Sequence, residues 1–379
     1  MTTISGLKRR TFWIIIALVA TVVIITGVVG GVLGSKQKSS SRASGSGATP
    51  TSTSPPPNPT SPRSNTALTV PSRSVNSTVA SGILIYQAFS NELYFSRISA
   101  DGGHDTPSSL GADFQAKPNT PLSALSVVDG PGFNSPFDSS LKIHVFFIDA
   151  SSYLSDAILS NGTWNLGTLR SYNVKPAASS KLASTVWFES KLPTLWIFFQ
   201  NNDGFIAEYG FSNGLWRAGN SGPTVNLRAS LGSGIGTCYD IDRHGFQRLR
   251  VYTQVPGGSI VSRDYDESNG LRWNDLYPLY QARNDVEDIS VVTSRNTNMT
   301  VETVKIFFVD GGEEVYVLNF GINGWARVPE YVVEKSDGTV AAADQDELRV
   351  YFQENNGTVI REARSGGDSK WEVTDNRIG

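Results

Sequence analysis

The sequence predicts an all-β fold, a six-bladed β-propeller with four antiparallel strands per blade, preceded by one transmembrane helix and a disordered stalk. Three observations predict the propeller. An apolar phrase recurs six times in residues 76–379, a segment of small residues precedes each copy, and a Trp follows most copies at a similar distance. A repeat of about fifty residues indicates a solenoid or a propeller, and closing a propeller into a ring limits the number of exposed strand edges.

The N-terminal segment differs sharply in composition from the rest of the chain. Residues 12–33 are uncharged and mostly apolar, long enough as a helix to cross a hydrocarbon core of about 30 Å. Lys8, Arg9 and Arg10 precede them, and basic residues favour the cytoplasmic side. We therefore expect a cytoplasmic tail at 1–10, a signal-anchor helix at 11–34, and an extracellular or lumenal C-terminal domain. A cleaved signal peptide is the alternative.

Residues 35–75 are rich in Ser, Thr and Pro. Such a segment buries too little apolar surface to offset the entropy of ordering, so we expect a disordered stalk. Residues 76–379 then form the predicted propeller domain. Four sequons follow the predicted span and favour glycosylation outside the cytoplasm; they begin at Asn76, Asn161, Asn298 and Asn356.

Charge and cysteine content exclude several classes of function. Residues 1–75 hold eight of the 32 basic residues and none of the 35 acidic ones. The remaining 24 basic and 35 acidic residues give residues 76–379 a net charge of −11, which argues against a nucleic-acid partner. Cys238 is the only cysteine, so we expect no intrachain disulfide and no metal or redox site of the CxxC kind. We also expect no cofactor. We predict that Cys238 is a buried packing thiol.

The apolar phrases predict strands because each is short, β-branched or aromatic, and followed by a turn containing Gly, Asn or Asp. The phrases begin at Ile83, Ile143, Leu195, Leu249, Val304 and Leu348. The second residue of each phrase is called its leading position. The leading positions are Leu84, His144, Trp196, Arg250, Lys305 and Arg349.

The segments around each phrase supply the other strands of a blade. Small residues precede it, as at Ser77 in the first repeat and Gly338 in the last, and suit an innermost strand because blades crowd together near the axis. A Trp follows in an outer strand at Trp164, Trp216, Trp273, Trp325 and Trp371. The first repeat lacks this Trp, and Phe114 is its candidate substitute. A pair of β-sandwiches is the alternative fold.

Polar residues at the leading positions are followed by acids in three repeats. His144 precedes Asp156 by twelve residues, Trp196 precedes Glu208 by twelve, and Arg349 precedes Glu362 by thirteen. Guanidinium donors and carboxylate acceptors can bind sugar hydroxyls, while an indole covers an apolar C–H face. The pattern therefore favours a neutral monosaccharide as the ligand.

These strand, acid and Trp elements resemble the fungal fucose-specific lectin family over residues 76–379. The resemblance implies a six-bladed propeller that binds fucose between neighbouring blades, without metal, through Arg and Glu of one blade and aromatic residues of the next. Counting twelve residues from the leading positions places the Glu position at Ser96, Asp156, Glu208, Ser262, Val317 and Arg361. No repeat keeps both Arg and Glu at that spacing; Arg349 and Glu362 pair if the hairpin holds one extra residue.

The resemblance and the residue chemistry together give eleven candidate ligand-binding residues. They are His144, Asp156, Glu208, Tyr209, Trp216, Arg250, Trp273, Trp325, Arg349, Glu362 and Trp371. Each also has a purely structural interpretation. The Trp residues are equally suited to packing between sheets, Arg250 to a solvated strand charge, His144 to a satisfied core position, and Glu362 to an outward-facing edge.

We therefore expect a membrane-anchored, lectin-like protein that binds glycans between blades and is not an enzyme. A propeller glycosidase is the first alternative, but the sequence has no SxDxGxxW box. It also has no GxSxG or HExxH motif. The second alternative is a protein-interaction propeller that has lost sugar binding, although neither WD nor kelch signatures recur.

Overall fold

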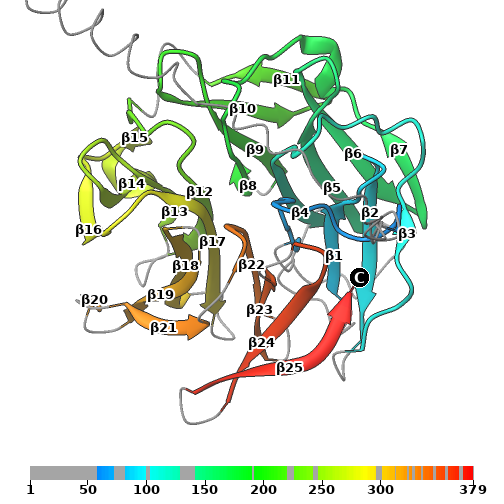
Figure 1. The fold of residues 1–379 in the computed structure, drawn as a ribbon. Coiled ribbons are helices and arrows are strands. Elements are labelled where there is room, and N and C mark those ends of the chain that lie inside the picture. The colour runs from blue at the N-terminus through cyan, green and yellow to red at the C-terminus, as the bar shows by residue number, and fades with distance from the viewer. Residues whose placement is uncertain are drawn as a thin grey trace, which may run out of the picture. The chain divides into compact units, whose positions relative to one another are not determined.

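Six β-sheets form a ring around a common centre in the second of two compact units, Pro56–Gly379 (Figure 1). The computed structural model describes residues 58–71, 82–99, 103–128, 141–189, 192–219, 226–241, 246–295, 301–311, 313–321, 324–326, 329–333, 336–344, 347–354, 357–366 and 370–378. The predicted tail and span lie outside these ranges, and no helix within the ranges is long and apolar enough to cross a membrane.

Each sheet is one blade, and its neighbouring strands are antiparallel. The first blade contains β1 (Gly82–Gln87), β2 (Leu93–Ile98) and β3 (Ser108–Ser109). The second contains β4 (Leu122–Val128), β5 (Leu141–Ile148), β6 (Leu154–Ser160) and β7 (Thr163–Leu166). The third contains β8 (Leu182–Glu189), β9 (Leu192–Gln200), β10 (Ile206–Ser212) and β11 (Leu215–Ala218). The fourth blade contains β12 (Ile235–Ile241), β13 (Gln247–Gln254), β14 (Ser259–Asp266), β15 (Arg272–Trp273) and β16 (Tyr277–Gln281). The fifth blade contains β17 (Val286–Arg295), β18 (Val301–Asp310), β19 (Glu314–Gly321), β20 (Gly324–Trp325) and β21 (Glu330–Val333). The sixth contains β22 (Val340–Asp344), β23 (Leu348–Gln353), β24 (Ile360–Ser365) and β25 (Trp371–Ile378). Two short 3-10 helices, η1 (Leu169–Tyr172) and η2 (Glu267–Asn269), follow β7 and β14.

The recurring phrases are strands, as predicted, but three blades depart from the predicted four strands: the first sheet has three named strands, and the fourth and fifth each have one addition. The recurring phrases are β1, β5, β9, β13, β18 and β23. Each packs fully buried side chains between neighbouring sheets; in five of them these include Val145, Ile197, Val251, Ile306 and Val350. The additions are β16 and β21, which pair with β14 and β19, so the fourth and fifth blades have five strands rather than the predicted four.

Small residues occur in the inner strands where neighbouring blades approach most closely. A Cβ atom on Gly236 of β12 would lie 2.5 Å from Ile289 Cγ2 and 2.6 Å from Val291 Cγ2 of β17. Both neighbours are β-branched side chains at a closely packed contact between blades, where atoms cannot overlap. The inner strand of the fourth blade therefore needs glycine at position 236. This confirms the predicted reason for small inner residues.

The ring begins before the predicted domain boundary at residue 76. Thr69 and Ile85 exchange two backbone hydrogen bonds, of 3.1 and 2.9 Å, so residues around Thr69 take the innermost position of the first blade. Leu68 and Val70 are buried in one cluster with Tyr351 and Ile378 of the last blade. The predicted stalk boundary at residue 75 must therefore be corrected, since residues 58–71 belong to the ring. The inner strand predicted near Ser77 lies outside the described residues.

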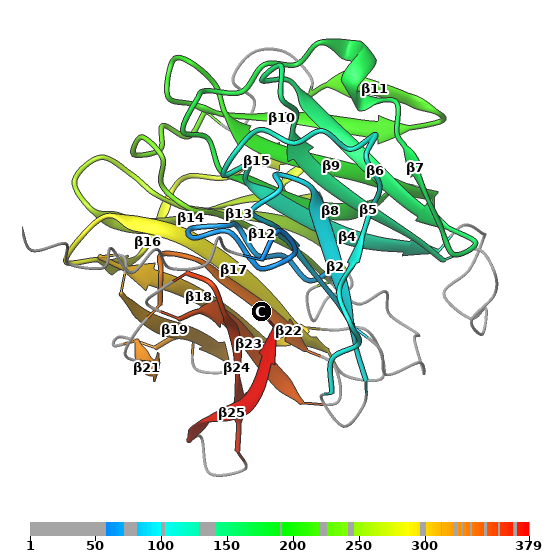
Figure 2. The ribbon, with the colours of Figure 1, turned by 45° about the vertical axis from the view of Figure 1, so that its right-hand side comes forward.

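In several blades, a glutamine at the end of the phrase donates a hydrogen bond to the next blade. Gln200 Nε2 donates to the Ala229 carbonyl at 3.1 Å, and Gln254 Nε2 donates to the Asn284 carbonyl at 2.8 Å. Gln353 Nε2 donates to the Arg63 carbonyl at 2.8 Å and closes the ring. Figure 2 shows the last blade, ending in β25, beside the first.

Candidate functional site

The strand register places three carboxylates at equivalent positions. Asp156 lies opposite Phe146, Glu208 opposite Phe198, and Glu362 opposite Tyr351. Each aromatic partner is two residues after the leading position of its phrase. Glu362 thus keeps the acid position, although the hairpin before it is one residue longer.

Counting along the sequence misplaces the acid position in two blades. In the first blade Tyr94, rather than Ser96, lies opposite Tyr86. In the last blade Arg361 lies opposite Phe352, one step away from the acid position. Ser262 and Val317 occupy it in the fourth and fifth blades, as counted. Within the described residues only three blades keep a carboxylate there.

The space between two neighbouring blades is called a seam and numbered by the blade that supplies the acid position. In the second to fifth seams, the aromatic residue opposite the acid position meets the next blade's Trp nearly edge to face. The centroid distances and interplanar angles are 5.9 Å and 87° for Phe146–Trp216, 6.4 Å and 89° for Phe198–Trp273, 6.1 Å and 76° for Tyr252–Trp325, and 5.6 Å and 89° for Phe307–Trp371. The predicted Trp residues therefore line the seams and also pack them.

His104 takes the place of the Trp in the sixth seam. It follows β2 in the first blade and meets Tyr351 of β23 at 6.0 Å and 79°, the geometry of the indole contacts. The expected substitute, Phe114, instead lies buried in the cluster between the first and second blades. Sequence analysis missed His104; the absence of Trp from the first repeat was the available signal.

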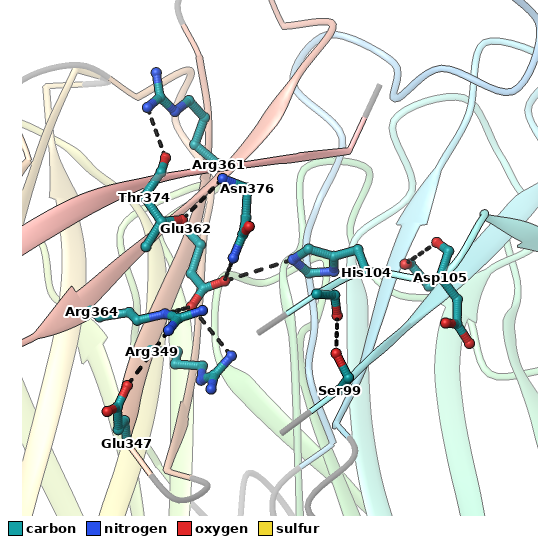
Figure 3. Close-up of polar contacts among 12 residues, drawn as sticks. Ser99, His104, Asp105, Glu347, Arg349, Arg361, Glu362, Arg364, Thr374 and Asn376 are labelled. Atoms are coloured by element: carbon teal, nitrogen blue, oxygen red, sulfur yellow. Dashed lines mark hydrogen bonds and ion pairs between the residues drawn. The ribbon is translucent and has the colours of Figure 1, made fainter. Parts of the chain in front are cut away.

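The sixth seam holds a network of charged side chains centred on Glu362 (Figure 3). Glu362 Oε1 accepts a hydrogen bond from Arg364 Nε at 2.5 Å and lies 3.4 Å from Arg349 Nη1. Its Oε2 accepts from Asn376 Nδ2 at 3.3 Å and lies 3.8 Å from His104 Nε2. The side chain of Glu362 is fully buried, so the alternative interpretation of Glu362 as an outward-facing edge residue is wrong.

This network determines the charge state of the carboxylate. Burial opposes ionisation of Glu362, but contacts with His104, Arg364 and Asn376 outweigh burial and lower the pKa of Glu362. At 3.8 Å the His104 contact is electrostatic and too long for a hydrogen bond. Burial and the nearby Glu362 charge raise the pKa of Tyr351, so this phenol stays neutral. The seam therefore carries one carboxylate held between two guanidinium groups.

The second seam contains the predicted His144, Asp156 and Trp216. His144 Nδ1 lies 3.9 Å from Asp156 Oδ2, and both side chains are buried. Asp156 Oδ1 also accepts a hydrogen bond from the Leu169 backbone N–H at 3.0 Å. A Cβ on Gly167 would lie 1.9 Å from Asp156 Oδ2. The backbone of residues 167–169 therefore covers this carboxylate.

The third seam places Glu208 among aromatic residues. Trp196, at the leading position, lies against Gly210, and Trp273 lines the seam from the next blade. Tyr209 is half-buried and packs on Phe199 at 6.3 Å, so it is on the face away from Glu208. Glu208 is 9% exposed, and a Cβ on Gly219 would lie 2.1 Å from its Oε1.

Arg250, at the leading position of the fourth blade, is engaged within its own sheet. Its Nε lies 3.2 Å from Asp240 Oδ2 and 3.5 Å from Asp264 Oδ2. Arg250 is only 4% exposed, so the expectation of a solvated strand charge is wrong. The fifth seam, between Phe307 and Trp371, has Val317 in place of an acid.

A model of the fungal fucose-specific lectin family matches residues 134–360. The chain belongs to this family. Similar lectins include fucose-specific lectins from Aleuria aurantia (28% identity over 255 residues, covering 65% of this chain and 72% of that protein) and Aspergillus oryzae (26% over 253 residues, covering 65% and 75%). The solved Aleuria aurantia lectin, a six-bladed β-propeller, matches with a TM-score of 0.65 and 22% identity over 83% of this chain and 96% of that one. This likeness confirms the six-bladed fold.

Membership in the fungal fucose-specific lectin family agrees with the prediction of a non-enzymatic protein, since these relatives are lectins. In the described part of the chain no group of three His, Cys, Asp or Glu residues is arranged to hold a metal ion. Cys238 is buried as predicted, and burial raises the pKa of its thiol to about 12.

Proposed function

We propose that this chain binds fucosylated glycans and that its principal site is the sixth seam. The observation that carries the proposal is the facing pair Arg349 and Glu362, with 3.4 Å between Nη1 and Oε1. These are the residue types, at the positions in the blade, that the family resemblance assigns to sugar contact. Guanidinium N–H groups donate to sugar hydroxyls and the carboxylate accepts from them.

The other two acid-bearing seams support sugar binding less well. Asp156 is covered by the backbone of 167–169 and pairs with His144 rather than with an Arg. Glu208 has Trp196 at its leading position, so that seam offers stacking but no guanidinium. We expect both seams to bind a monosaccharide more weakly than the sixth.

Sugar entry into the sixth seam requires a side-chain movement. Glu362 is fully buried and His104 stands 3.8 Å from it without a hydrogen bond. A sugar hydroxyl that enters between the two side chains replaces this contact with two hydrogen bonds. The movement is confined to the imidazole, because Arg364 and Asn376 hold the carboxylate from its own blade.

The proposal extends to display of the ring outside the cytoplasm on the N-terminal anchor and stalk. The chain enters the ring beside the β1–β2 hairpin, where Phe89 N–H donates to the Ser61 carbonyl. His104 follows the opposite end of β2, so it lies at the other end of this strand from Ser61. Asn161 is exposed in the turn between β6 and β7, which suits glycosylation; Asn76, Asn298 and Asn356 lie outside the described residues.

A glycan array probed with the full chain in mild detergent tests the function. We expect retention on fucosylated oligosaccharides and none on their defucosylated counterparts. Hydrolysis of a glycoside reporter without retained binding would favour the glycosidase, and silence in both assays would favour a protein-interaction propeller. Protection of the ring from protease in sealed microsomes tests its placement; cleavage without detergent would contradict it.

A further inference from the structure

Arg364 lies directly opposite Arg349 across β23 and β24, two residues after Glu362 and on the same face of the strand. In the other five blades the position opposite the leading residue holds no basic side chain. The residues found there are Ser96, Ile158, Gly210, Asp264 and Asn319. Arg364 is therefore peculiar to the sixth seam and belongs to none of the repeated sequence elements.

Two like charges at opposite positions of neighbouring strands repel each other, and Glu362 supplies the anion that compensates them. Its Oε1 accepts a hydrogen bond from Arg364 Nε at 2.5 Å and lies 3.4 Å from Arg349 Nη1. Figure 3 shows the three side chains meeting at this carboxylate. The repulsion is relieved while Glu362 stays ionised and turned toward both guanidinium groups, so the arginine pair fixes the orientation of the carboxylate.

The contacts on Oε1 determine where the second oxygen of Glu362 points. Oε2 accepts a hydrogen bond from Asn376 Nδ2 at 3.3 Å and lies 3.8 Å from His104 Nε2. Because His104 belongs to the first blade, Oε2 is the oxygen that faces across the seam. A tilt of the carboxylate away from that side would break the bond between Oε1 and Arg364.

The two other acid-bearing seams lack this arrangement. The residue two positions after the acid is Ile158 in the second blade and Gly210 in the third, and neither side chain can donate a hydrogen bond. Asp156 instead accepts from the backbone N–H of Leu169 at 3.0 Å. The sixth seam is thus the acid-bearing seam in which a basic side chain orients the carboxylate from its own strand.

Arg364 also keeps the carboxylate charged. Burial of Glu362 opposes ionisation, but contacts with His104, Arg364 and Asn376 lower the pKa of Glu362, and Arg364 contributes through both its hydrogen bond and its charge. In return, although burial opposes it, the contacts with Glu362 and Glu347 raise the pKa of Arg364. An ionised acceptor binds a hydroxyl more strongly than a neutral one.

We infer that Arg364 is a positioning residue for the sugar site of the sixth seam, holding Glu362 ionised and turned so that Oε2 accepts a hydrogen bond from a sugar hydroxyl. Arg364 acts through Glu362 and does not need to touch the sugar. The inference rests on the proposed sugar-binding function of this seam. It adds a residue that lies outside the leading position, the acid position and the Trp of the repeat.

Calorimetric titration of the full chain with methyl α-L-fucoside, from pH 7 to pH 3, tests the inference. Binding at the sixth seam is the part that Glu362→Gln removes. We expect Arg364→Gln to weaken this binding at pH 7 by at least about tenfold, as loss of a charged hydrogen-bond partner implies. Because Arg364 lowers the pKa of Glu362, its loss should also move the decline of binding in acid to a higher pH.

Two further variants separate charge from geometry. Arg364→Lys keeps the positive charge but not the planar guanidinium, so we expect weakened binding that declines at the same pH as in the natural chain. Arg361→Gln is the matched control on the same strand. Arg361 donates to Glu354 at 2.7 Å and to the Thr374 carbonyl at 2.8 Å, outside the contacts of Glu362, so its loss should change neither the affinity nor the pH of the decline.

Thermal unfolding of each variant shows whether the ring is intact, and the binding outcomes then distinguish the inference from the function beneath it. Fucoside binding through Glu362 that Arg364→Gln leaves unchanged would overturn the inference and leave the sugar-binding function standing. A loss of affinity without a shift of the acid decline would assign Arg364 a purely structural role and contradict the inference. If Arg364→Gln does not fold, natural affinity in Arg364→Lys would overturn it. Failure of the natural chain to bind the fucoside would overturn both.

Discussion

Glu362 lies directly opposite Tyr351 across β23 and β24, in the same register that sets Asp156 opposite Phe146 and Glu208 opposite Phe198. The extra residue between Arg349 and Glu362 is accommodated in the hairpin, so the acid keeps its place facing the seam. This register makes the sixth seam the one described seam with both a guanidinium at the leading position and a carboxylate at the acid position.

Residues 58–71 should contribute to the stability of the ring as core residues do. Leu68 is 4% exposed and packs between the first and last blades. We expect Leu68→Ala to lower the free energy of unfolding by about 2–5 kcal/mol, through lost burial and the cavity left behind. Leu231→Ala, at a side chain that is 79% exposed, is the control and should change stability by less than about 0.5 kcal/mol. Equal urea midpoints for the two variants would contradict the assignment of residues 58–71 to the ring.

Gly219 should be intolerant of any side chain because Glu208 occupies the space. A Cβ there would lie 2.1 Å from Glu208 Oε1. We expect Gly219→Ala to destabilise the ring by about 1–3 kcal/mol, measured by urea unfolding. Gly321→Ala is the matched control, because a Cβ on Gly321 meets nothing within 4 Å. Equal free energies of unfolding for the two variants would show that the Glu208 side chain can move aside without destabilising the ring.

Arg250 should be needed for stability because it compensates two carboxylates. Its removal leaves Asp240, which is fully buried, and Asp264 with less compensation. We expect Arg250→Met to lower the free energy of unfolding by about 3–5 kcal/mol, the effect of breaking a buried pair from one side. Lys305→Met changes the half-exposed leading residue of the next blade and should have a small effect. If the two variants lost comparable free energy of unfolding, Arg250 would have no special stabilising role beside Asp240 and Asp264.

The network around Glu362 should make stability depend on pH. Because its pKa is lowered in the folded ring, the ionised carboxylate stabilises the fold above the ordinary value of about 4.3, and this contribution is lost as pH falls through the folded pKa. We expect the urea midpoints of the natural chain and Glu362→Gln to differ most near pH 7 and to converge in acid. A difference that stays constant from pH 7 to pH 3 would contradict the charge assignment.

The repeating parts of the fold were predictable because each phrase combines a strand pattern with a turn. Turns such as Asn161-Gly162 and Asn213-Gly214, all with positive φ, match the sequence signal for tight hairpins. The start of the ring was not predictable. Leu68 and Val70 sit in a Ser/Pro-rich segment whose composition indicates disorder, and their burial depends on the last blade closing over them.

The site was predictable only where hairpin length stays constant. A count of twelve residues locates Asp156 and Glu208, but the first hairpin is shorter and the last is longer, so the count gives Ser96 and Arg361 where the register gives Tyr94 and Glu362. His104 belongs to no repeated motif. Only ring closure brings it to Tyr351 and Glu362.

The most direct test of sugar binding at the sixth seam is a titration of the full chain with a fucosylated oligosaccharide, comparing the natural chain with Glu362→Gln and with the exposed control Glu372→Gln. Loss of the carboxylate removes an acceptor while keeping the shape of the side chain. We predict that Glu362→Gln weakens binding at least about tenfold, as loss of a charged hydrogen-bond partner implies, and that Glu372→Gln leaves binding unchanged. Equal affinity in all three proteins would contradict the placement of the site between the sixth and first blades.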